Sequence, residues 1–401
     1  MGLIVQKFGG SSVADAERIC RVAKIITDAY SAGNSVVAVV SAQGDTTDDL
    51  IKKALEINQS PSKREMDVLL STGEQMSMSL LAMAIEKLGY PVISLTGWQV
   101  GLQTDASHGC ARIRRIDKER LENELSKQNI VIVAGFQGIN RYEDVTTLGR
   151  GGSDTSAVAL AAVLKADICQ IYTDVDGIYT ADPRLVPSAK KLDAITYDEM
   201  LELSNLGVQV LHGRSVEMAK KYSVRLEVLS SFENKPGTIL KEVVKVEKML
   251  IRGVTRDNDT ARISITEIPD VPGIAFKIFS ILASKNINVD IILQSLGRNN
   301  TQDISFTVAN SQKDEAMEAL KEVAELFNAK SIECDDYVSK VSIVGAGIKS
   351  HPGVAAKMFE ALADADINIK MISTSEIKVS VLINRDDSDK AVKVIHEAFD
   401  F

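Results

Sequence analysis

The sequence has few of the residues and patterns that mark secreted, membrane-spanning or zinc-holding proteins. Its four cysteines include no Cys-x-x-Cys pair, and its four histidines show no metal-ligand spacing. No apolar run approaches the ~20 residues of a membrane span, and the N-terminus enters a strand pattern at once, without a basic region followed by an apolar core. These absences favour a cytoplasmic protein with reduced thiols, no bound zinc, no signal peptide and no membrane partner.

The chain also has fewer basic than acidic residues. Lysine and arginine number 46 against 55 acidic residues, which gives a net charge of −9, and no long basic run occurs. Nucleic acids and anionic membrane surfaces are therefore not expected as partners, and any phosphate site must be built from local cations and backbone amides. A chain of 401 residues with 45% apolar and 25% charged residues is expected to form two or three globular domains.

A glycine-rich stretch at residues 147–154, Thr-Leu-Gly-Arg-Gly-Gly-Ser-Asp, is the strongest local signal. It lies between a strand pattern and a helix pattern, and Ser153 or Asp154 can cap a helix whose first amides then face an anion. Arg150 adds a planar cation suited to phosphate or carboxylate, while Asp154 can hold Mg²⁺, an amide or a substrate ammonium. A plain glycine-rich connection with a capping aspartate is the alternative.

The first residues repeat this strand, glycine turn and helix arrangement. Residues 3–8 predict a buried strand that ends in Lys7, Phe8, Gly9 and Gly10, just before an amphipathic helix pattern. The lysine precedes the glycines, unlike the lysine of a P-loop, so we expect it to reach over phosphates from the strand end. A solvated lysine is the alternative.

Two further loops follow predicted strands of a parallel sheet. A valine run at residues 35–40 leads into a hydroxyl-rich loop at residues 41–48, where ligands bind in open α/β sheets; a cluster of caps for a helix starting near residue 48 is the alternative. A strand at residues 167–174 leads into residues 175–184, whose carboxylates, tyrosine and arginine suit an adenine nucleotide and its phosphates; a pair of simple turns is the alternative.

Glu74 lies inside a long helical pattern at residues 65–88. The apolar pattern is interrupted at residues 71–75, Ser-Thr-Gly-Glu-Gln, which would let the Glu74 carboxylate point into a polar cleft. A surface acid is the alternative for this position.

The last part of the chain repeats itself. Residues 271–279 align with residues 351–359, each with a Pro-Gly turn before a helix pattern, and residues 286–289 match residues 366–369. Each copy predicts a strand, a helix, two strands and a helix. The sequence therefore predicts an α/β domain followed by two homologous α+β modules.

Five motifs in this order, together with the tandem repeat, resemble aspartate kinase of the monofunctional bacterial type. The motifs are residues 7–12, 41–47, 72–74, 149–154 and 173–184. The resemblance implies the amino-acid-kinase fold, with a mainly parallel central sheet and helices on both faces, followed by two ferredoxin-like ACT modules. It also implies phosphoryl transfer from MgATP to the side-chain carboxylate of L-aspartate, giving 4-phospho-L-aspartate for lysine, threonine and methionine biosynthesis, with ATP and Mg²⁺ as cofactors and no metal-binding residues assigned.

The resemblance assigns roles to residues by matching motif. Lys7 would stabilise the transferred phosphoryl group, Asp154 would orient Lys7, and Arg150 and Glu74 would hold the carboxylate and ammonium ends of aspartate. No general base is needed, because the nucleophile is already an ionised carboxylate. The other substrate-binding residues would be Ser41, Thr47, Gly151, Gly152 and Ser153. The nucleotide-binding residues would be Lys7, Phe8, Gly9, Gly10, Thr173, Asp174, Tyr179 and Arg184.

The ACT modules imply regulation by an amino acid. In the family one module is inserted in the other, so the expected domains are residues 1–247 for catalysis, 262–337 for the first ACT module, and 248–261 with 338–401 for the second. Such modules pair across subunits, which implies a homodimer or higher oligomer, with a separate ACT-only subunit as a further option. The effector would be lysine, threonine or both.

Effector binding is expected mainly at the first ACT copy. The second copy has Ser350 where the first has Asp270, and Lys370 where the first has Asp290. The expected effector residues are Asp270, Gly273, Ile274, Ala275, Phe276, Asn288, Val289, Asp290 and Gln294.

One position departs from the family pattern. Gln209 stands where many relatives carry a lysine near the nucleotide, which leaves open how the ATP phosphates are balanced, and Arg214 or Lys220 is a candidate substitute. Two other functions are retained at this point: an amino-acid kinase acting on a different acid, carbamate or nucleotide, and a catalytically silent amino-acid sensor.

Overall fold

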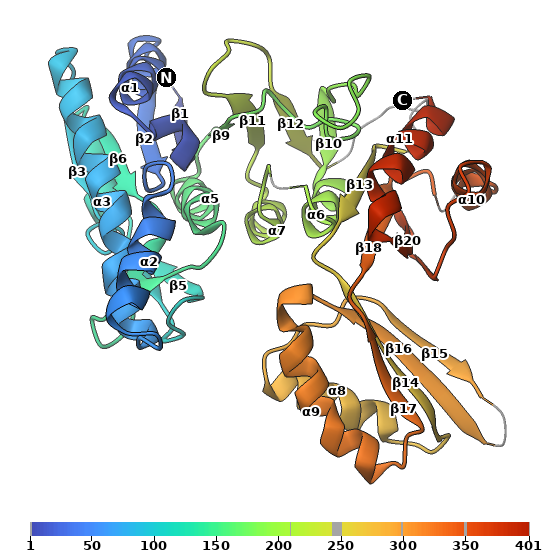
Figure 1. Cartoon of the computed structure of the whole chain (residues 1–401). Coiled ribbons are helices and arrows are strands. Elements are labelled where there is room, and N and C mark those ends of the chain that lie inside the picture. The colour runs from blue at the N-terminus through green and yellow to red at the C-terminus, as the bar shows by residue number, and fades with distance from the viewer. Residues whose placement is uncertain (1, 209, 243–250, 298–299, 349–350, 401) are drawn as a thin grey trace. The chain divides into compact units, whose positions relative to one another are not determined.

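The structure is a computed structural model that describes residues 2–208, 210–242, 251–297, 300–348 and 351–400 (Figure 1). Contacts divide the chain into two compact units, and each is described by itself. The first comprises Met1–Tyr179 and Lys191–Val246, and the second comprises Thr180–Lys190 and Glu247–Phe401.

The first unit is built on an eight-stranded sheet in the order β10-β12-β11-β9-β1-β2-β6-β3. β11 and β12 pair antiparallel, and the other pairings recorded in this sheet are parallel. Every residue of β6 is buried, as expected for a parallel sheet with both faces covered. The strands are β1 (Leu3–Phe8), β2 (Ser35–Val40), β3 (Val92–Leu95), β6 (Ile130–Ala134), β9 (Ile168–Thr173), β10 (Ala194–Thr196), β11 (Leu226–Ser230) and β12 (Thr238–Lys241).

Helices cover both faces of this sheet. Successive side chains of β1 point to opposite faces, so Phe8 joins the apolar cluster formed with α1 and α3, whereas Lys7 reaches α5. α3 also has the length and hydropathy of a membrane span, but its apolar residues Met78, Leu81 and Ile85 lie in that cluster. The helices are α1 (Ala16–Ser31), α2 (Thr46–Ile57), α3 (Lys63–Lys87), α4 (Glu119–Ser126), α5 (Gly152–Leu164), α6 (Tyr197–Asn205) and α7 (Gly213–Lys221).

A second, smaller sheet of the first unit carries the glycine-rich loop. Its order is β5-β4-β7-β8, and β8 ends at Thr147, directly before the glycines. The strands are β4 (Leu102–Thr104), β5 (Ile113–Ile116), β7 (Gln137–Ile139) and β8 (Val145–Thr147).

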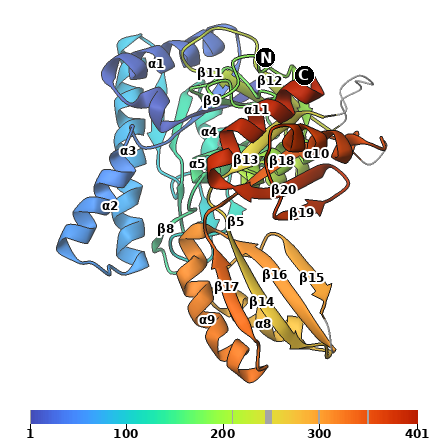
Figure 2. The same ribbon diagram turned by 45° about the vertical axis from the view of Figure 1, so that its right-hand side comes forward.

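The second unit contains two four-stranded antiparallel sheets, each packed against a pair of helices (Figure 2). One sheet has the order β15-β16-β14-β17 and the other β13-β18-β20-β19. The first module contains β14 (Ala261–Pro269), α8 (Ile274–Ser284), β15 (Ile292–Leu296), β16 (Thr301–Val308), α9 (Lys313–Leu326) and β17 (Ser331–Asp335). The second contains β13 (Gly253–Asp257), β18 (Val338–Val344), α10 (Val354–Asp364), β19 (Met371–Thr374), β20 (Lys378–Asn384) and α11 (Ser388–Phe399).

The two modules differ in where their last strand comes from. In the first, β17 follows α9 and pairs with β14. In the second, the equivalent edge position beside β18 is taken by β13, which precedes the whole first module in the sequence. The predicted repeat of strand, helix, two strands and helix is confirmed, and each copy gains this additional edge strand.

The segment Thr180–Lys190 belongs to the second unit although its neighbours in sequence belong to the first. Ala181 and Val186 are buried in the apolar cluster of the second module. Thr180 accepts a hydrogen bond from Val254 N at 2.8 Å, and its hydroxyl lies 2.9 Å from His396 Nε2. The segment is therefore part of the core of this module rather than a free loop.

Candidate active site

An ion pair between Lys7 and Asp154 lies next to the centre of the large sheet. Lys7 Nζ is 2.7 Å from Asp154 Oδ1, and the two side chains are 12% and 9% exposed. Lys7 comes from β1, which is hydrogen-bonded to a strand on each side, and Asp154 comes from the first turn of α5. The pair fixes the ammonium while leaving donor capacity for a ligand, since a lysine ammonium carries three protons.

The backbone beside Lys7 depends on its two glycines. A Cβ at Gly10 would stand 2.7 Å from Ala42 O, so only glycine allows this turn to approach the loop after β2. A Cβ at Gly9 would stand 3.4 Å from Lys7 Nζ. The absence of a side chain at Gly9 therefore keeps space open beside the ammonium, which suits a phosphate group.

Glu74 is buried, and the surface alternative for it is wrong. Its side chain is on α3, which runs unbroken through Gly73, and the residue is 4% exposed. Oε1 accepts a hydrogen bond from Ala42 N at 3.1 Å, whereas Oε2 has no hydrogen-bond partner among the described residues. Burial raises the pKa of Glu74 to about 7. A buried carboxylate with one unsatisfied oxygen is suited to a ligand ammonium.

The glycine-rich loop turns sharply between β8 and α5. Gly149 and Gly151 have φ angles of +76° and +68°, a region that favours glycine. A Cβ at Gly151 would stand 2.3 Å from His212 Cβ, so the His212 side chain packs directly over the loop. Burial lowers the pKa of His212. Arg150 is exposed at the tip of the turn, and Ser153 is buried behind it.

Arg214 braces the same loop, a role that the sequence did not indicate. Its guanidinium donates hydrogen bonds of 2.9 Å to Leu148 O and to Ala111 O. Lys220 pairs with Asp198 at 2.6 Å. Both candidate substitutes for a nucleotide-binding lysine thus have protein partners, and Gln209 itself lies outside the described residues.

Loops after three strands meet at the predicted nucleotide side. Ser231, which follows β11, donates its backbone N–H to Thr173 O at 2.9 Å, and its hydroxyl accepts a hydrogen bond from Ser12 at 2.9 Å. Ser231 was missed from sequence because it belongs to no glycine motif. Tyr179 donates to Asp176 at 2.7 Å, and this bond is the main reason that the pKa of Tyr179 is raised to about 12.

Seven of the sixteen predicted catalytic-half residues gather at one edge of the large sheet, at the carboxyl ends of its parallel strands, where ligands bind in this class of fold. Thr47 lies in the first turn of α2 and Asp174 is exposed just after β9. Arg184 belongs to the second unit, where it pairs with Asp182 at 2.8 Å. The residues gathered at the sheet edge are Lys7, Phe8, Gly9, Gly10, Ser41, Asp154 and Thr173.

The predicted effector residues of the first ACT module fall into two groups. Gly273 caps α8 with a φ of +97°, next to exposed Asp270 and exposed Phe276, while Ile274 is buried in the module core. Asp290, at the other end of the module, accepts an ion pair of 2.5 Å from Lys340 of the second module. The remaining members are Ala275, Asn288, Val289 and Gln294, of which Gln294 bonds to Gln302.

The second module has a hollow at the equivalent turn. Its volume is about 420 Å³, and Pro352, Gly353, Thr374, Ser375 and Glu376 are among the residues that line it. Ser350, whose difference from Asp270 favoured the first module, lies outside the described residues. The second copy thus has space for a small ligand at its Pro-Gly turn.

Comparison with known proteins places these features in a family. The amino acid kinase family matches residues 2–230, and the ACT domain matches residues 263–323 and 341–399. An aspartokinase of Bacillus sp. (strain MGA3) is 51% identical over 401 residues, which cover 100% of this chain and 98% of that relative.

Solved structures agree with the sequence comparison. The crystal structure of E. coli aspartokinase III in complex with aspartate and ADP (R-state) is 26% identical, with a TM-score of 0.83, over 99% of both chains. The same enzyme in complex with lysine and aspartate (T-state) is 25% identical, with a TM-score of 0.75, over 99% of both chains.

Proposed function

The chain belongs to the aspartokinase family and is an ATP-dependent kinase that phosphorylates L-aspartate, and we propose that Lys7, Asp154 and Glu74 carry this reaction together with Arg150. The observation that carries the proposal is the Lys7–Asp154 ion pair beside open space at Gly9. This arrangement supplies a fixed cation at a position where a phosphoryl group can approach.

The proposed mechanism needs alignment and charge neutralisation rather than a base. MgATP supplies the phosphoryl group, and its Mg²⁺ offsets the negative charge of the phosphates. Lys7 donates to the phosphoryl oxygens, and Asp154 holds the Lys7 ammonium in place. The site fits the nucleotide because the missing side chain at Gly9 leaves space beside this ammonium, and the end of β9 borders it through the hydrogen bond from Gly9 N to Tyr172 O at 3.3 Å.

Aspartate is proposed to bind on the other side of Lys7. Its ammonium pairs with the unsatisfied Oε2 of Glu74, and its α-carboxylate binds the guanidinium of Arg150. Ser41 and Thr47 complete the pocket with hydroxyls, and the backbone of the turn at residues 151–153 lines it, with the Gly152 N–H held by Gly149 O at 2.9 Å. The β-carboxylate is then free to attack the phosphoryl group.

Feedback control is the second part of the proposal. The lysine complex of E. coli aspartokinase III and the two ACT modules of this chain support inhibition by lysine, threonine or both. We propose that the effector binds at the Asp270 turn of the first module, and that the modules pair across subunits of a cytoplasmic homodimer or larger oligomer. Inhibition requires the effector to favour a conformation that binds aspartate or ATP poorly.

The test is MgATP-dependent phosphorylation of L-aspartate, with the acyl phosphate trapped by hydroxylamine, run alone and with lysine, threonine and both. Activity suppressed by one or both amino acids supports the kinase and the sensor together and identifies the effector. Activity that neither amino acid changes refutes the proposed regulation. An equal rate with succinate, which lacks the ammonium, contradicts the proposed contact with Glu74, and an equal rate with β-alanine, which lacks the α-carboxylate, contradicts the proposed contact with Arg150.

A further inference from the structure

A second buried carboxylate, that of Asp67, lies on α3 outside the reaction described above. It is 1% exposed and stands two helical turns before Glu74, so both acids occupy the same face of the helix. A buried carboxylate is costly unless several donors satisfy it. Its partners therefore indicate what it holds.

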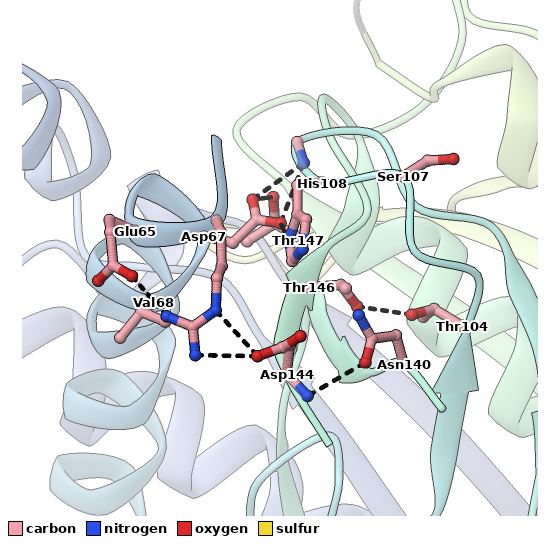
Figure 3. A network of polar contacts seen from close by, with 12 residues as sticks. Glu65, Asp67, Val68, Thr104, Ser107, His108, Asn140, Asp144, Thr146 and Thr147 are labelled. Carbon is pink, nitrogen blue, oxygen red and sulfur yellow. Dashed lines mark hydrogen bonds and ion pairs between the residues drawn. The ribbon is translucent and has the colours of Figure 1, made fainter. Parts of the chain in front are cut away.

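Asp67 is bound by donors from two other segments (Figure 3). His108 Nδ1 lies 2.9 Å from its Oδ2, and the backbone N–H of Gly109 donates to both oxygens at 3.0 Å. The hydroxyl of Thr147 donates to Oδ1 at 2.5 Å. One carboxylate thus joins α3, the loop that carries His108, and the last residue of β8.

These contacts lead directly to the glycine-rich loop. Thr147 precedes Arg150 by three residues, and its carbonyl accepts a hydrogen bond from Ala111 N at 2.9 Å. A Cβ at Gly149 would stand 3.0 Å from Gly109 O, so the segment around Gly109 packs against the turn. The start of the turn is fixed from one side by Asp67 and its two partner segments.

We infer that Asp67 is a positioning residue that acts through Thr147 and the Gly109 segment to present Arg150 to the α-carboxylate of aspartate. The inference rests on the proposed role of Arg150. Asp67 does not touch the substrate in this account, and among the described residues its hydrogen bonds run to His108, Gly109 and Thr147 rather than to the nucleotide side. Loss of the Asp67 charge should therefore raise the KM for aspartate much more than the KM for ATP.

The experiment measures kcat, both KM values and the thermal midpoint for a set of variants of the full chain. Asp67→Asn and Thr147→Val remove the charged acceptor and its hydroxyl donor, while Thr147→Ser keeps the donor. Asp144→Asn is the matched control, because this acid lies nearby but binds Arg64 at the surface. Arg150→Gln provides the reference effect.

We expect Asp67→Asn and Thr147→Val to raise the aspartate KM about ten- to hundredfold, the effect of losing one hydrogen bond to a charged group. The ATP KM should stay within about twofold, Thr147→Ser should restore the aspartate KM to within about threefold, and Asp144→Asn should leave both unchanged. If Asp67→Asn does not fold, the two Thr147 variants decide.

An equal rise of both KM values, or unchanged KM values with a lower thermal midpoint, would overturn the inference and leave Asp67 a purely structural group. The roles of Arg150 and Asp67 are tested separately. An unchanged aspartate KM in Arg150→Gln refutes the role of Arg150 itself. A raised value in Arg150→Gln together with normal values in the Asp67 and Thr147 variants refutes the positioning role alone.

Discussion

Replacing Glu74 with glutamine should weaken the binding of aspartate and make the folded protein more stable. Burial raises the pKa of this carboxyl from its ordinary 4.5 to about 7, so ionising it in the folded protein costs about 3 kcal/mol more than in the unfolded chain. Because the folded pKa is the higher one, the neutral form favours folding at low pH, and this contribution is lost as pH rises through about 7. Glutamine keeps an acceptor for Ala42 N and never ionises.

The expected stability effect therefore depends on pH. At pH 8 the Glu74→Gln variant should be more stable by up to about 3 kcal/mol, or about 6 to 12 °C in the melting of the kinase unit. Near pH 4.5 the two proteins should melt at the same temperature. Glu86→Gln, an exposed acid on the same helix, is the control and should show no difference at either pH.

The ionisation of Glu74 that lowers stability at high pH should raise kcat/KM for aspartate over the same pH range. Ionised Glu74 binds the ammonium of aspartate, so kcat/KM for aspartate should fall about tenfold per pH unit below about 7 and level off above it. In Glu74→Gln it should be about 10- to 100-fold lower at pH 8 and independent of this titration. A break near pH 7 that survives in the variant, or equal melting shifts at pH 5 and pH 8, would refute the reasoning.

Three shorter predictions follow from other contacts. Lys7→Ala should lower kcat at least ~100-fold while circular dichroism shows a retained fold, and near-normal turnover would remove the phosphoryl-stabilising role. Asp270→Ala should relieve inhibition by the effector with little change in uninhibited activity, whereas unchanged sensitivity would show that the first ACT module is not the effector site. Gly151→Ala should destabilise the kinase unit by about 2–4 kcal/mol in thermal melts, because the added Cβ would overlap His212. Gly109→Ala is the control: nothing lies within 4 Å of its added Cβ, so it should destabilise the unit by only about 1 kcal/mol.

Sequence reasoning worked best where the signal is local. A strand, a glycine turn and a helix are written in consecutive residues, so the placement of Lys7 and Asp154 at strand and helix ends could be predicted, and so could the repeat of the two ACT modules. The aspartokinase family itself could also be identified, because its motifs are short and ordered along the chain.

Features that depend on distant packing could not be predicted in this way. Glu74 is buried because the loop containing Ala42 covers it, and His212 lies over Gly151 although they are far apart in sequence. Arg184 continues the predicted nucleotide loop in sequence, but the apolar residues around it, such as Val186, pack in the second ACT module. The periodicity of apolar residues indicates which face of a helix or strand is buried, but it does not indicate which distant segment covers that face.

The strand order of the second ACT module has a consequence for how the chain is made. β13 pairs with β18 through Gly253 and Val344, and the whole first module is synthesised between them. At about 5–20 residues per second, β13 waits roughly 4 to 16 seconds on the ribosome for its partner, while the first module can close its own sheet as soon as β17 emerges. During that interval the edges of β13 are open to pairing with another nascent strand. A variant in which the β13 segment is transposed to follow α11 would remove the delay. It should aggregate less during expression.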